Sequence, residues 1–272
     1  LASSAASDVY KRQTLSIRYS MPQWIVDRFV AAYGEKKAEE IFKAFHNKST
    51  ISIRTNLTRC TPDELRATLE AEGVTVTAVD ELNYAFVISG FDYLNGLQSF
   101  RDGLFYVQDI SSMLVAQTAA PKKGDYVIDV CAAPGGKSTH IAELLRGSGH
   151  VFARDLTDNK VDMIEENIDR HGLNNMSAEV WDATVFDADS AGKADILICD
   201  LPCSGLGVLG RKKDIRYKMT PESVDELVVL QRQILDTVHT YVKPNGVLVY
   251  STCTIDEAEN CLLYTSPSPR DG

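Results

Sequence analysis

The chain has 272 residues, of which 44% are hydrophobic and 24% charged, a composition typical of a soluble globular protein with one or two domains. No apolar run approaches the roughly 18 residues of a membrane-spanning helix, so the sequence predicts no membrane segment. The formal charge of −10 lies entirely in residues 125–272, because residues 1–124 carry 14 basic and 14 acidic side chains. This balance argues against indiscriminate nucleic-acid binding and still allows a local basic surface.

Six cysteines are scattered along the chain, without CxxC pairs or the Cys/His spacings typical of metal sites. The sequence therefore predicts neither a metal site nor a disulfide framework. Free thiols in a chain of this size are typical of a reducing compartment, so we expect a cytoplasmic protein. Nothing in the sequence marks an obligate interface, and we expect a monomer.

Both ends of the chain resemble translated adaptor sequence from library preparation. Residues 1–13 and 261–272 lack the periodic pattern of a helix or strand, and we exclude both from the fold interpretation. An ordinary disordered tail is the alternative interpretation of either end. If the adaptor interpretation holds, Cys261 is non-native and the chain is a fragment.

The first half of the chain, residues 14–124, has the pattern of a small α+β module. Apolar residues at three- and four-residue spacing predict a helix over 21–46, and alternation predicts a strand over 50–56. Thr61, Pro62 and Glu64 are a helix start signal, and that helix should run to about residue 73. Two short strands are predicted over 74–79 and 85–88.

From residue 125 onward, apolar strands and helices alternate. Strands are predicted over 126–131, 151–155, 178–181, 196–199 and 247–250, and helices over 138–145, 160–171 and 221–241. Continuous apolar strands separated by helices predict a mostly parallel, doubly wound sheet that is covered on both faces. We therefore expect an α/β protein with a Rossmann-like domain over 125–260, preceded by the small α+β domain.

A glycine turn over 131–137 follows the first of these strands and opens the next helix. Glycines let the backbone approach a ligand, and the first N–H groups of a helix are unpaired. A P-loop would need glycine where Cys131 stands, and the G-x-G-x-x-G dinucleotide fingerprint is absent. S-adenosylmethionine needs only a close glycine turn and acceptors for its ribose hydroxyls, which makes it the predicted cofactor.

Two aspartates stand where such acceptors are needed. Asp155 ends the second strand, 19 residues after Gly136, where an acidic group typically accepts from ribose hydroxyls. Asp182 follows the third strand and is placed to flank the adenine. Either aspartate alone is more often a strand-end or helix-cap residue, but together with the glycine turn they favour a cofactor site.

Cys203 and Cys253 follow two later strands, in the segments 200–203 and 251–253. The carboxyl ends of parallel strands share one edge of the sheet, where ligands bind. Methylation of cytosine C5 requires a thiolate that adds to C6, an acid that polarises the ring, and a group that assists elimination. Asp200, Cys203 and Cys253 supply such groups, and Lys137 is a candidate cation beside them. The remaining native cysteines, Cys60, Cys131 and Cys199, are interpreted as small buried hydrophobes.

The segments 129–138, 200–205 and 251–253 together resemble the Nol/Sun family of RNA cytosine-C5 methyltransferases, and within it the bacterial Sun-type enzymes of small-subunit ribosomal RNA. The resemblance covers nearly all of residues 20–260. It implies S-adenosylmethionine as cofactor and ribosomal RNA as partner. It also implies that Cys253 is the nucleophile and that Cys203 helps to release the product. In DNA cytosine methyltransferases the Pro-Cys cysteine attacks instead, so these two roles rest on the family.

Further site residues follow from the same resemblance. Those implied to contact the cofactor or the base are Cys131, Ala132, Ala133, Pro134, Gly135, Gly136, Lys137, Asp155, Asp182 and Asp200. The basic run Arg211, Lys212, Lys213 and Arg216 would hold RNA phosphates near an extruded base, although an isolated charge run is usually a solvated loop. Arg54 and Arg59 make the N-terminal module a second candidate RNA surface, with simple solvation as the alternative.

Two other functions stay open. A methyltransferase of the same fold could act on a protein or a small molecule, but the paired thiols would then be unexplained. A non-catalytic RNA-binding assembly factor would retain only a vestigial pocket, and the intact glycines, acids and both cysteines argue against it. The sequence also departs from the bacterial Sun-type pattern, because we find neither the extra N-terminal helical domain nor the strands expected beyond residue 260.

Overall fold

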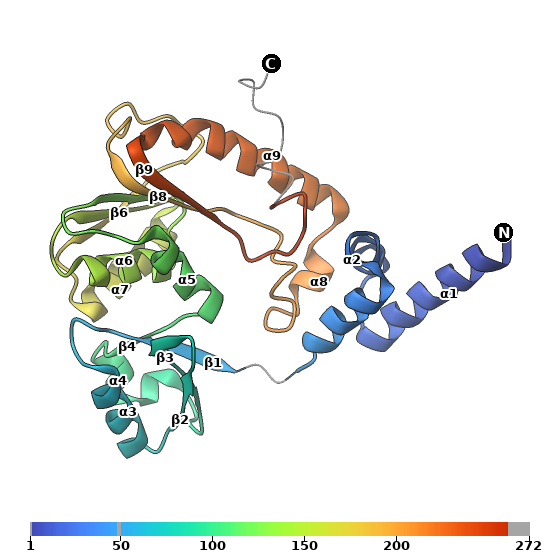
Figure 1. Cartoon of the computed structure of the whole chain (residues 1–272), viewed down its shortest axis with the longest axis horizontal. Coiled ribbons are helices and arrows are strands. Elements are labelled where there is room, and N and C mark those ends of the chain that lie inside the picture. The colour runs from blue at the N-terminus through green and yellow to red at the C-terminus, as the bar shows by residue number, and fades with distance from the viewer. Residues whose placement is uncertain (1, 48–49, 261–272) are drawn as a thin grey trace. The chain divides into compact units, whose positions relative to one another are not determined.

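The computed structural model describes residues 2–47 and 50–260, with side chains described from Tyr10 onward (Figure 1). Residues 261–272, and with them the interpretation of that end as adaptor sequence, lie outside the described residues. The chain forms two compact units. One comprises the described residues of 1–49, 202–232 and 252–272, and the other comprises residues 50–201 and 233–251.

The first unit is built on helices. Its elements are α1 (Ala2–Tyr19), α2 (Gln23–Ala44), α8 (Ile215–Lys218) and the first part of α9 (Pro221–Val238). Helix α2 confirms the predicted helix, whereas α1 covers most of a segment that the sequence analysis left without structure. Leu15 and Tyr19 of α1 pack with α2 and with Leu206 and Leu209 in one apolar cluster. This packing gives α1 an apolar contact surface that its own composition did not reveal.

The second unit begins with a four-stranded antiparallel sheet. Its strands are β1 (Ile51–Thr55), β2 (Thr75–Val79), β3 (Leu82–Ser89) and β4 (Phe105–Val107), in the order β2-β3-β1-β4. Helix α3 (Pro62–Ala71) buries Leu65 and Leu69 in the same apolar cluster as this sheet. Thr61 and Glu64 form a reciprocal capping box, as the start signal predicted. Short helical segments at Leu94–Gly96 and Gln98–Arg101 (α4) lead into β4.

The same unit contains a five-stranded parallel sheet, which confirms the predicted fold class. Its strands are β5 (Tyr126–Asp129), β6 (His150–Asp155), β7 (Met176–Val180), β8 (Ala194–Asp200) and β9 (Val242–Ser251). They lie in the order β7-β6-β5-β8-β9, and each neighbouring pair is parallel. The chain therefore changes direction at β5, and open sheets bind ligands at such a switch point.

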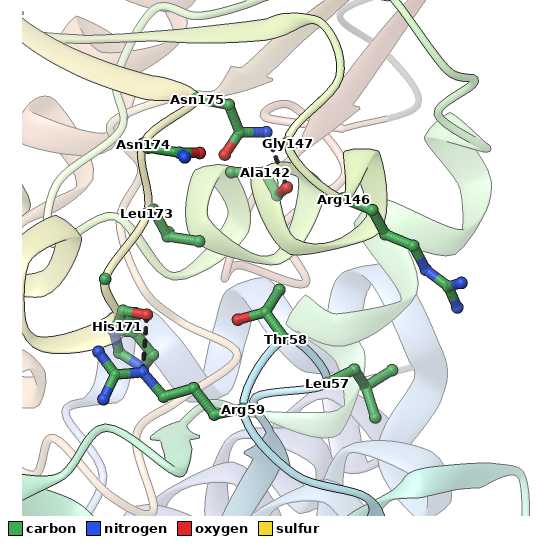
Figure 2. Close-up of a pocket in the computed structure, with 11 residues that line it drawn as sticks. Leu57, Thr58, Arg59, Ala142, Arg146, Gly147, His171, Leu173, Asn174 and Asn175 are labelled. Carbon is green, nitrogen blue, oxygen red and sulfur yellow. Dashed lines mark hydrogen bonds between the residues drawn. The ribbon is translucent and has the colours of Figure 1, made fainter.

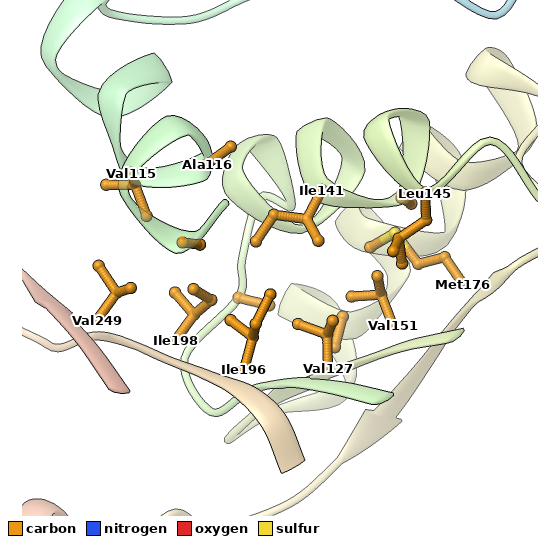
Figure 3. Close-up of a cluster of buried hydrophobic side chains, with 14 of the residues drawn as sticks. Val115, Ala116, Val127, Ile141, Leu145, Val151, Met176, Ile196, Ile198 and Val249 are labelled. Carbon is orange, nitrogen blue, oxygen red and sulfur yellow. The ribbon is translucent and has the colours of Figure 1, made fainter. Parts of the chain in front are cut away.

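Helices α5 (Ile110–Ala119) and α6 (Gly136–Leu145) pack their apolar side chains on the parallel sheet (Figure 3). Val115 of α5 and Ile141 of α6 lie over strand residues such as Val127 and Ile198. Burying one such side chain contributes roughly 1.5–3 kcal/mol. The apolar pattern of the sequence predicted no helix at α5, which precedes residue 125 and nevertheless packs on this sheet. Within the described residues, no helix is both long and apolar enough to cross a membrane.

Candidate active site

The loop between β5 and α6 lies at the switch point of the parallel sheet. Its backbone is fixed from β6, because the Ala132 N–H donates to the Arg154 carbonyl at 2.8 Å and the Ala133 N–H donates to Asp155 Oδ2 at 2.9 Å. Gly135 has a φ of +102°, a conformation that L side chains rarely adopt, and α6 begins directly after it. Because the first N–H groups of a helix have no partner within it, this loop presents donors to a ligand.

Asp155 ends β6 and is joined to this loop. Its Oδ1 accepts from the Leu156 N–H at 2.8 Å and from Lys160 Nζ at 2.9 Å, while its Oδ2 accepts from Ala133. A carboxylate oxygen can accept two hydrogen bonds, so Oδ2 retains capacity for a hydroxyl. The loop and Asp155 therefore fit a ligand that carries vicinal hydroxyls, as the ribose of S-adenosylmethionine does.

Asp182 lies two residues beyond the end of β7, at the same edge of the sheet. Its Oδ1 accepts from the Thr184 N–H at 2.9 Å and the Thr184 hydroxyl at 2.7 Å, which closes a local turn. The neighbouring Trp181 N–H donates to the Asp155 carbonyl at 2.9 Å and ties this turn to β6. Asp182 is exposed, so its carboxylate can also meet a ligand at this edge.

Asp129, the last residue of β5, is hydrogen-bonded to α6 and so connects the two elements on either side of the loop. The sequence did not predict this role. The Ser138 hydroxyl of α6 donates to Asp129 Oδ2 at 2.5 Å. Burial raises the pKa of Asp129 from 3.8 to about 7, and the hydrogen bond from Ser138 opposes that rise. An acid at the end of a strand, directly before a glycine turn, was the signal that could have revealed it.

We expect Asp129→Asn to flatten the pH dependence of stability between about pH 4 and 7. An acid whose pKa is higher in the folded protein binds more protons there, so the contribution of Asp129 to wild-type stability falls as pH rises from 3.8 to about 7 and levels off above it. Thermal melts of both proteins across this range measure the difference. Parallel curves of melting temperature against pH would show that Asp129 does not titrate in this window.

Lys137 and Asp200 form an ion pair in the second unit. Lys137 Nζ lies 2.5 Å from Asp200 Oδ2, and the Ser251 hydroxyl donates to Asp200 Oδ1 at 2.8 Å. The Leu201 N–H donates to the Ser251 carbonyl at 3.3 Å. This hydrogen bond holds the residue after β8 beside the last residue of β9. The structure thus joins two predicted site residues and gives Asp200 a fixed orientation.

Cys203 and Cys253 form a close pair of thiols in the first unit. Their sulfur atoms are 3.3 Å apart, and the Cys253 N–H donates to Cys203 Sγ at 3.3 Å. Cys253 is exposed, whereas Cys203 is only partly so. The hydrogen bond with Cys253 and burial both raise the pKa of Cys203, which keeps that side chain a neutral thiol. The pair therefore contains one accessible sulfur and, beside it, one neutral thiol that can donate a hydrogen bond to it.

The other described cysteines are held as neutral thiols. Burial raises the pKa of Cys60 to about 11, and it raises the pKa of Cys131 and Cys199 as well. Over residues 2–47 and 50–260, no three or more His, Cys, Asp or Glu side chains form a group that could hold a metal ion.

Glu259 links the two turns that carry the thiols. It is buried, and it accepts from the Ser204 N–H at 2.8 Å, from the Ser204 hydroxyl, and from Gln231 Nε2 at 3.0 Å. Gln231 also donates to the Pro202 carbonyl at 2.8 Å, and the Ser204 and Thr254 hydroxyls are 3.0 Å apart. This network holds the residue after Cys203 against the residue after Cys253. The sequence analysis missed it because the partners lie up to 55 residues apart.

We expect Glu259→Gln to destabilise the protein by about 1–3 kcal/mol, since an amide replaces one acceptor oxygen with a donor and leaves a buried donor unpaired. Urea denaturation of the variant and of wild type measures this cost. Glu226→Gln, at an exposed position of α9, is the matched control and should change little. Equal effects of the two substitutions would contradict the buried network.

The basic side chains predicted to bind RNA divide into two kinds. Arg211, Lys212 and Lys213 are exposed. Arg216 is buried and donates to the Tyr19 carbonyl at 3.4 Å and the Leu209 carbonyl at 3.3 Å, so it braces the fold instead of facing solvent. Arg54 is likewise buried, 1% exposed, which removes it from the candidate RNA surface of the N-terminal module. Arg59 remains exposed.

The chain is similar to curated ribosomal RNA methyltransferases of bacteria. It is 39% identical over 248 residues to "Probable ribosomal RNA small subunit methyltransferase B" of Bacillus subtilis, a match that covers 90% of this chain and 55% of that protein. It is 33% identical over 251 residues to the protein of the same description from Synechocystis, covering 91% of this chain and 56% of that protein. The chain thus spans little more than half the length of these relatives.

Solved structures with the same fold include two proteins from Pyrococcus horikoshii. A methyltransferase homolog superposes with a TM-score of 0.81 at 26% identity, covering 93% of this chain and 80% of the other. NSun6 with SFG superposes with a TM-score of 0.79 at 25% identity, covering 86% of this chain and 83% of the other. These likenesses extend over both compact units.

Two family matches cover most of the chain. Residues 21–91 match the ferredoxin-like domain described as Methyltr_RsmF/B-like, and residues 116–265 match the family described as 16S rRNA methyltransferase RsmB/F. S-adenosylmethionine is the cofactor of this fold and family, and the loop at β5 together with Asp155 fits it. Because the second match alone covers more than half of the sequence, the chain belongs to the RsmB/F family of 16S rRNA methyltransferases.

Proposed function

We propose that this protein methylates C5 of a cytosine in small-subunit ribosomal RNA through a covalent adduct between Cys253 and C6. The observation that carries the proposal is the pair of thiols with sulfur atoms 3.3 Å apart, of which Cys253 is exposed. A methyltransferase that acts at an already nucleophilic atom would need neither thiol. The names of the bacterial relatives support ribosomal RNA of the small subunit as the substrate.

The reaction needs the thiols because C5 of cytosine is a poor nucleophile. Addition of the Cys253 thiolate to C6 breaks the C5–C6 double bond and places electron density on C5, which then forms a bond to the methyl group. S-adenosylmethionine, when bound, would supply that methyl group as an electrophile, with its sulfur–methyl bond breaking and S-adenosylhomocysteine leaving. Solvent water then accepts the C5 proton, the electron pair of the C–H bond restores the C5–C6 double bond as the C6–S bond breaks, and the Cys253 thiolate leaves. Cys203, held as a neutral thiol beside Cys253, is proposed to assist this release by donating a hydrogen bond to the departing sulfur.

The remaining site residues have proposed roles that match their chemistry. Asp200 would either accept from the exocyclic amine of cytosine or, when protonated, donate to N3, and its partner Lys137 would stand near the base. The cofactor would be held by the loop residues 131–137, by Asp155 at its ribose and by Asp182 near its adenine. Arg211, Lys212 and Lys213 would hold RNA phosphates. We also propose that the protein acts as a cytoplasmic monomer.

Release of the hydrogen on C5 tests this function directly. Small-subunit ribosomal RNA labelled with tritium at C5 of cytosine should release tritium into water when the protein and S-adenosylmethionine are added, in step with methyl incorporation. Methylation at any other atom of cytosine or of the ribose leaves that tritium in place. Methyl incorporation without tritium release would therefore contradict C5 as the acceptor, and RNA labelled at C5 of uracil serves as the control.

A further inference from the structure

A pocket of about 580 Å³ opens in the second unit (Figure 2). Three segments line it: residues 57–59 after β1, the end of α6 around Arg146, and the turn over 171–175 between α7 (Asp158–His171) and β7. The second and third segments lie at the ends of α6 and α7 and directly before β7. The pocket is thus at the amino edge of the sheet, and nothing in the proposed reaction uses it.

The lining of this pocket is basic in a chain whose net charge is −10. It includes Arg59 and Arg146, and none of its eleven residues is acidic. Arg59 is held in place, because Nε donates to the His171 carbonyl at 3.0 Å and Nη1 donates to the Asp102 carbonyl at 2.6 Å. Figure 2 shows the Arg146 side chain on the opposite side of the pocket. Two positive charges on facing sides favour an anionic ligand.

Arg146 is the side chain best placed to bind such an anion. It is exposed, and within the part of the chain that the structure describes its guanidinium has no protein partner. Its backbone has a φ of +50°, in the left-handed region that disfavours any residue with a Cβ. An arginine therefore stands where the backbone alone would prefer glycine.

The rest of the lining combines apolar and amide groups. Leu57, Ala142 and Leu173 supply an apolar surface. The Asn175 amide donates to the Ala142 carbonyl at 3.0 Å, which fixes the direction of its side chain, and Asn174 lies beside it. A flat ring can lie on the apolar part while amides meet its polar edge, and the arginines suit a phosphate. A nucleotide has both parts, and a pocket of this size is typical for a ligand of that kind.

We propose that this pocket binds one unpaired nucleotide of an RNA strand, with its phosphate at Arg146, near the charge of Arg59, and its base over Leu57 and Leu173. The phosphate contact follows from the pocket itself, whereas the assignment to RNA rests on the proposed function. This site would be a second anchor for the substrate, at the amino edge of the sheet. It would hold the RNA without taking part in the reaction.

The substitution Arg146→Gly should weaken RNA binding without lowering the stability of the fold. Glycine removes the charge and suits the positive φ, so the melting temperature should stay the same or rise. Binding of a fluorescein-labelled ten-nucleotide single-stranded RNA, followed by fluorescence anisotropy, should weaken by about fivefold, and the salt slope should fall by about 0.7 for one lost phosphate contact. Arg146→Lys should restore most of the affinity, and Lys123→Gln, an exposed cation of the same unit outside the pocket, should change little.

Two other outcomes of the binding experiments would overturn the proposal. Equal losses of RNA affinity with Arg146→Gly and Lys123→Gln would show that the effect comes from the net charge of the protein and not from the pocket. If Arg146→Gly weakens binding of cytidine monophosphate or inorganic phosphate but leaves RNA affinity unchanged, the pocket takes a free phosphate compound and not RNA. The tritium-release assay remains independent: binding of RNA through Arg146 without tritium release would contradict the proposed function and leave this site standing.

Discussion

Replacing Cys253 with alanine is expected to abolish methyl transfer to small-subunit ribosomal RNA, lowering the rate by roughly 10³-fold or more. In the proposed mechanism, nothing would add to C6 without the Cys253 sulfur, and C5 would stay a poor nucleophile. The exposed position of Cys253 should let the purified variant keep its fold and its affinity for S-adenosylmethionine. Incorporation of tritiated methyl groups measures the rate, and calorimetric titration of the cofactor measures the retained binding.

Cys203→Ala should have a different effect, because in the proposed mechanism the adduct would form but would not break down efficiently. A denaturing gel should then show the protein joined to RNA, with a labelled methyl group, whereas Cys253→Ala should show no such band. Cys60→Ala is the matched control, since this cysteine lies in the other unit and burial keeps it a neutral thiol. A stalled adduct with Cys253→Ala instead would exchange the two roles. Normal methylation by both variants would refute the covalent mechanism.

Arg54→Met is expected to cost about 3–5 kcal/mol of stability, the largest effect predicted for any residue outside the thiols. Arg54 extends from β1 and is buried; its Nη2 lies 2.8 Å from Glu143 Oε1 and its Nε lies 3.2 Å from Oε2. Its guanidinium also donates to the Gly136 carbonyl at 3.0 Å and to the Thr139 hydroxyl at 3.2 Å, both in α6. The substitution would leave Glu143 buried without its counter-charge.

The large loss of stability expected for Arg54→Met comes from Glu143, which would keep a buried charge without a partner. Burial already raises the pKa of Glu143, and the charge of Arg54 is the main influence that lowers it again. The double variant Arg54→Met/Glu143→Leu should therefore recover much of the stability, since a well-packed apolar pair can replace a buried ion pair. Chemical denaturation of the single and double variants measures the recovery. Arg232→Met, at an exposed position, is the control, and a single variant no less stable than this control would contradict the assignment.

The same contacts connect the four-stranded sheet with the start of α6. Because Arg54 donates to the Gly136 carbonyl, it also fixes the first turn of the helix that follows the cofactor loop. A lower affinity for S-adenosylmethionine should accompany the loss of stability in Arg54→Met. Sequence patterns predict Arg54 only as part of a candidate RNA surface, since the alternation in β1 does not show what covers each face of the strand.

Much of the fold follows from the sequence alone. Apolar periodicity, the capping signal at Thr61 and the glycine turn at 131–137 are local patterns, and local patterns determine where helices and strands begin. They correctly predicted the parallel sheet and the helices α2, α3, α6 and α7. The two Cys-containing segments were also recognisable, because each directly follows an apolar strand.

Only the tertiary structure decided which side chains meet. It paired Cys203 with Cys253, joined Lys137 to Asp200, and buried Arg216 among backbone carbonyls although its neighbours in the run are exposed. The helices α1 and α5 depend on the surfaces they pack against, which short-range periodicity does not encode. Burial and side-chain contacts depend on residues that are far apart in the chain. The ion pair of Lys137, the pairing of the two thiols and the pocket at Arg146 therefore follow only from the tertiary structure.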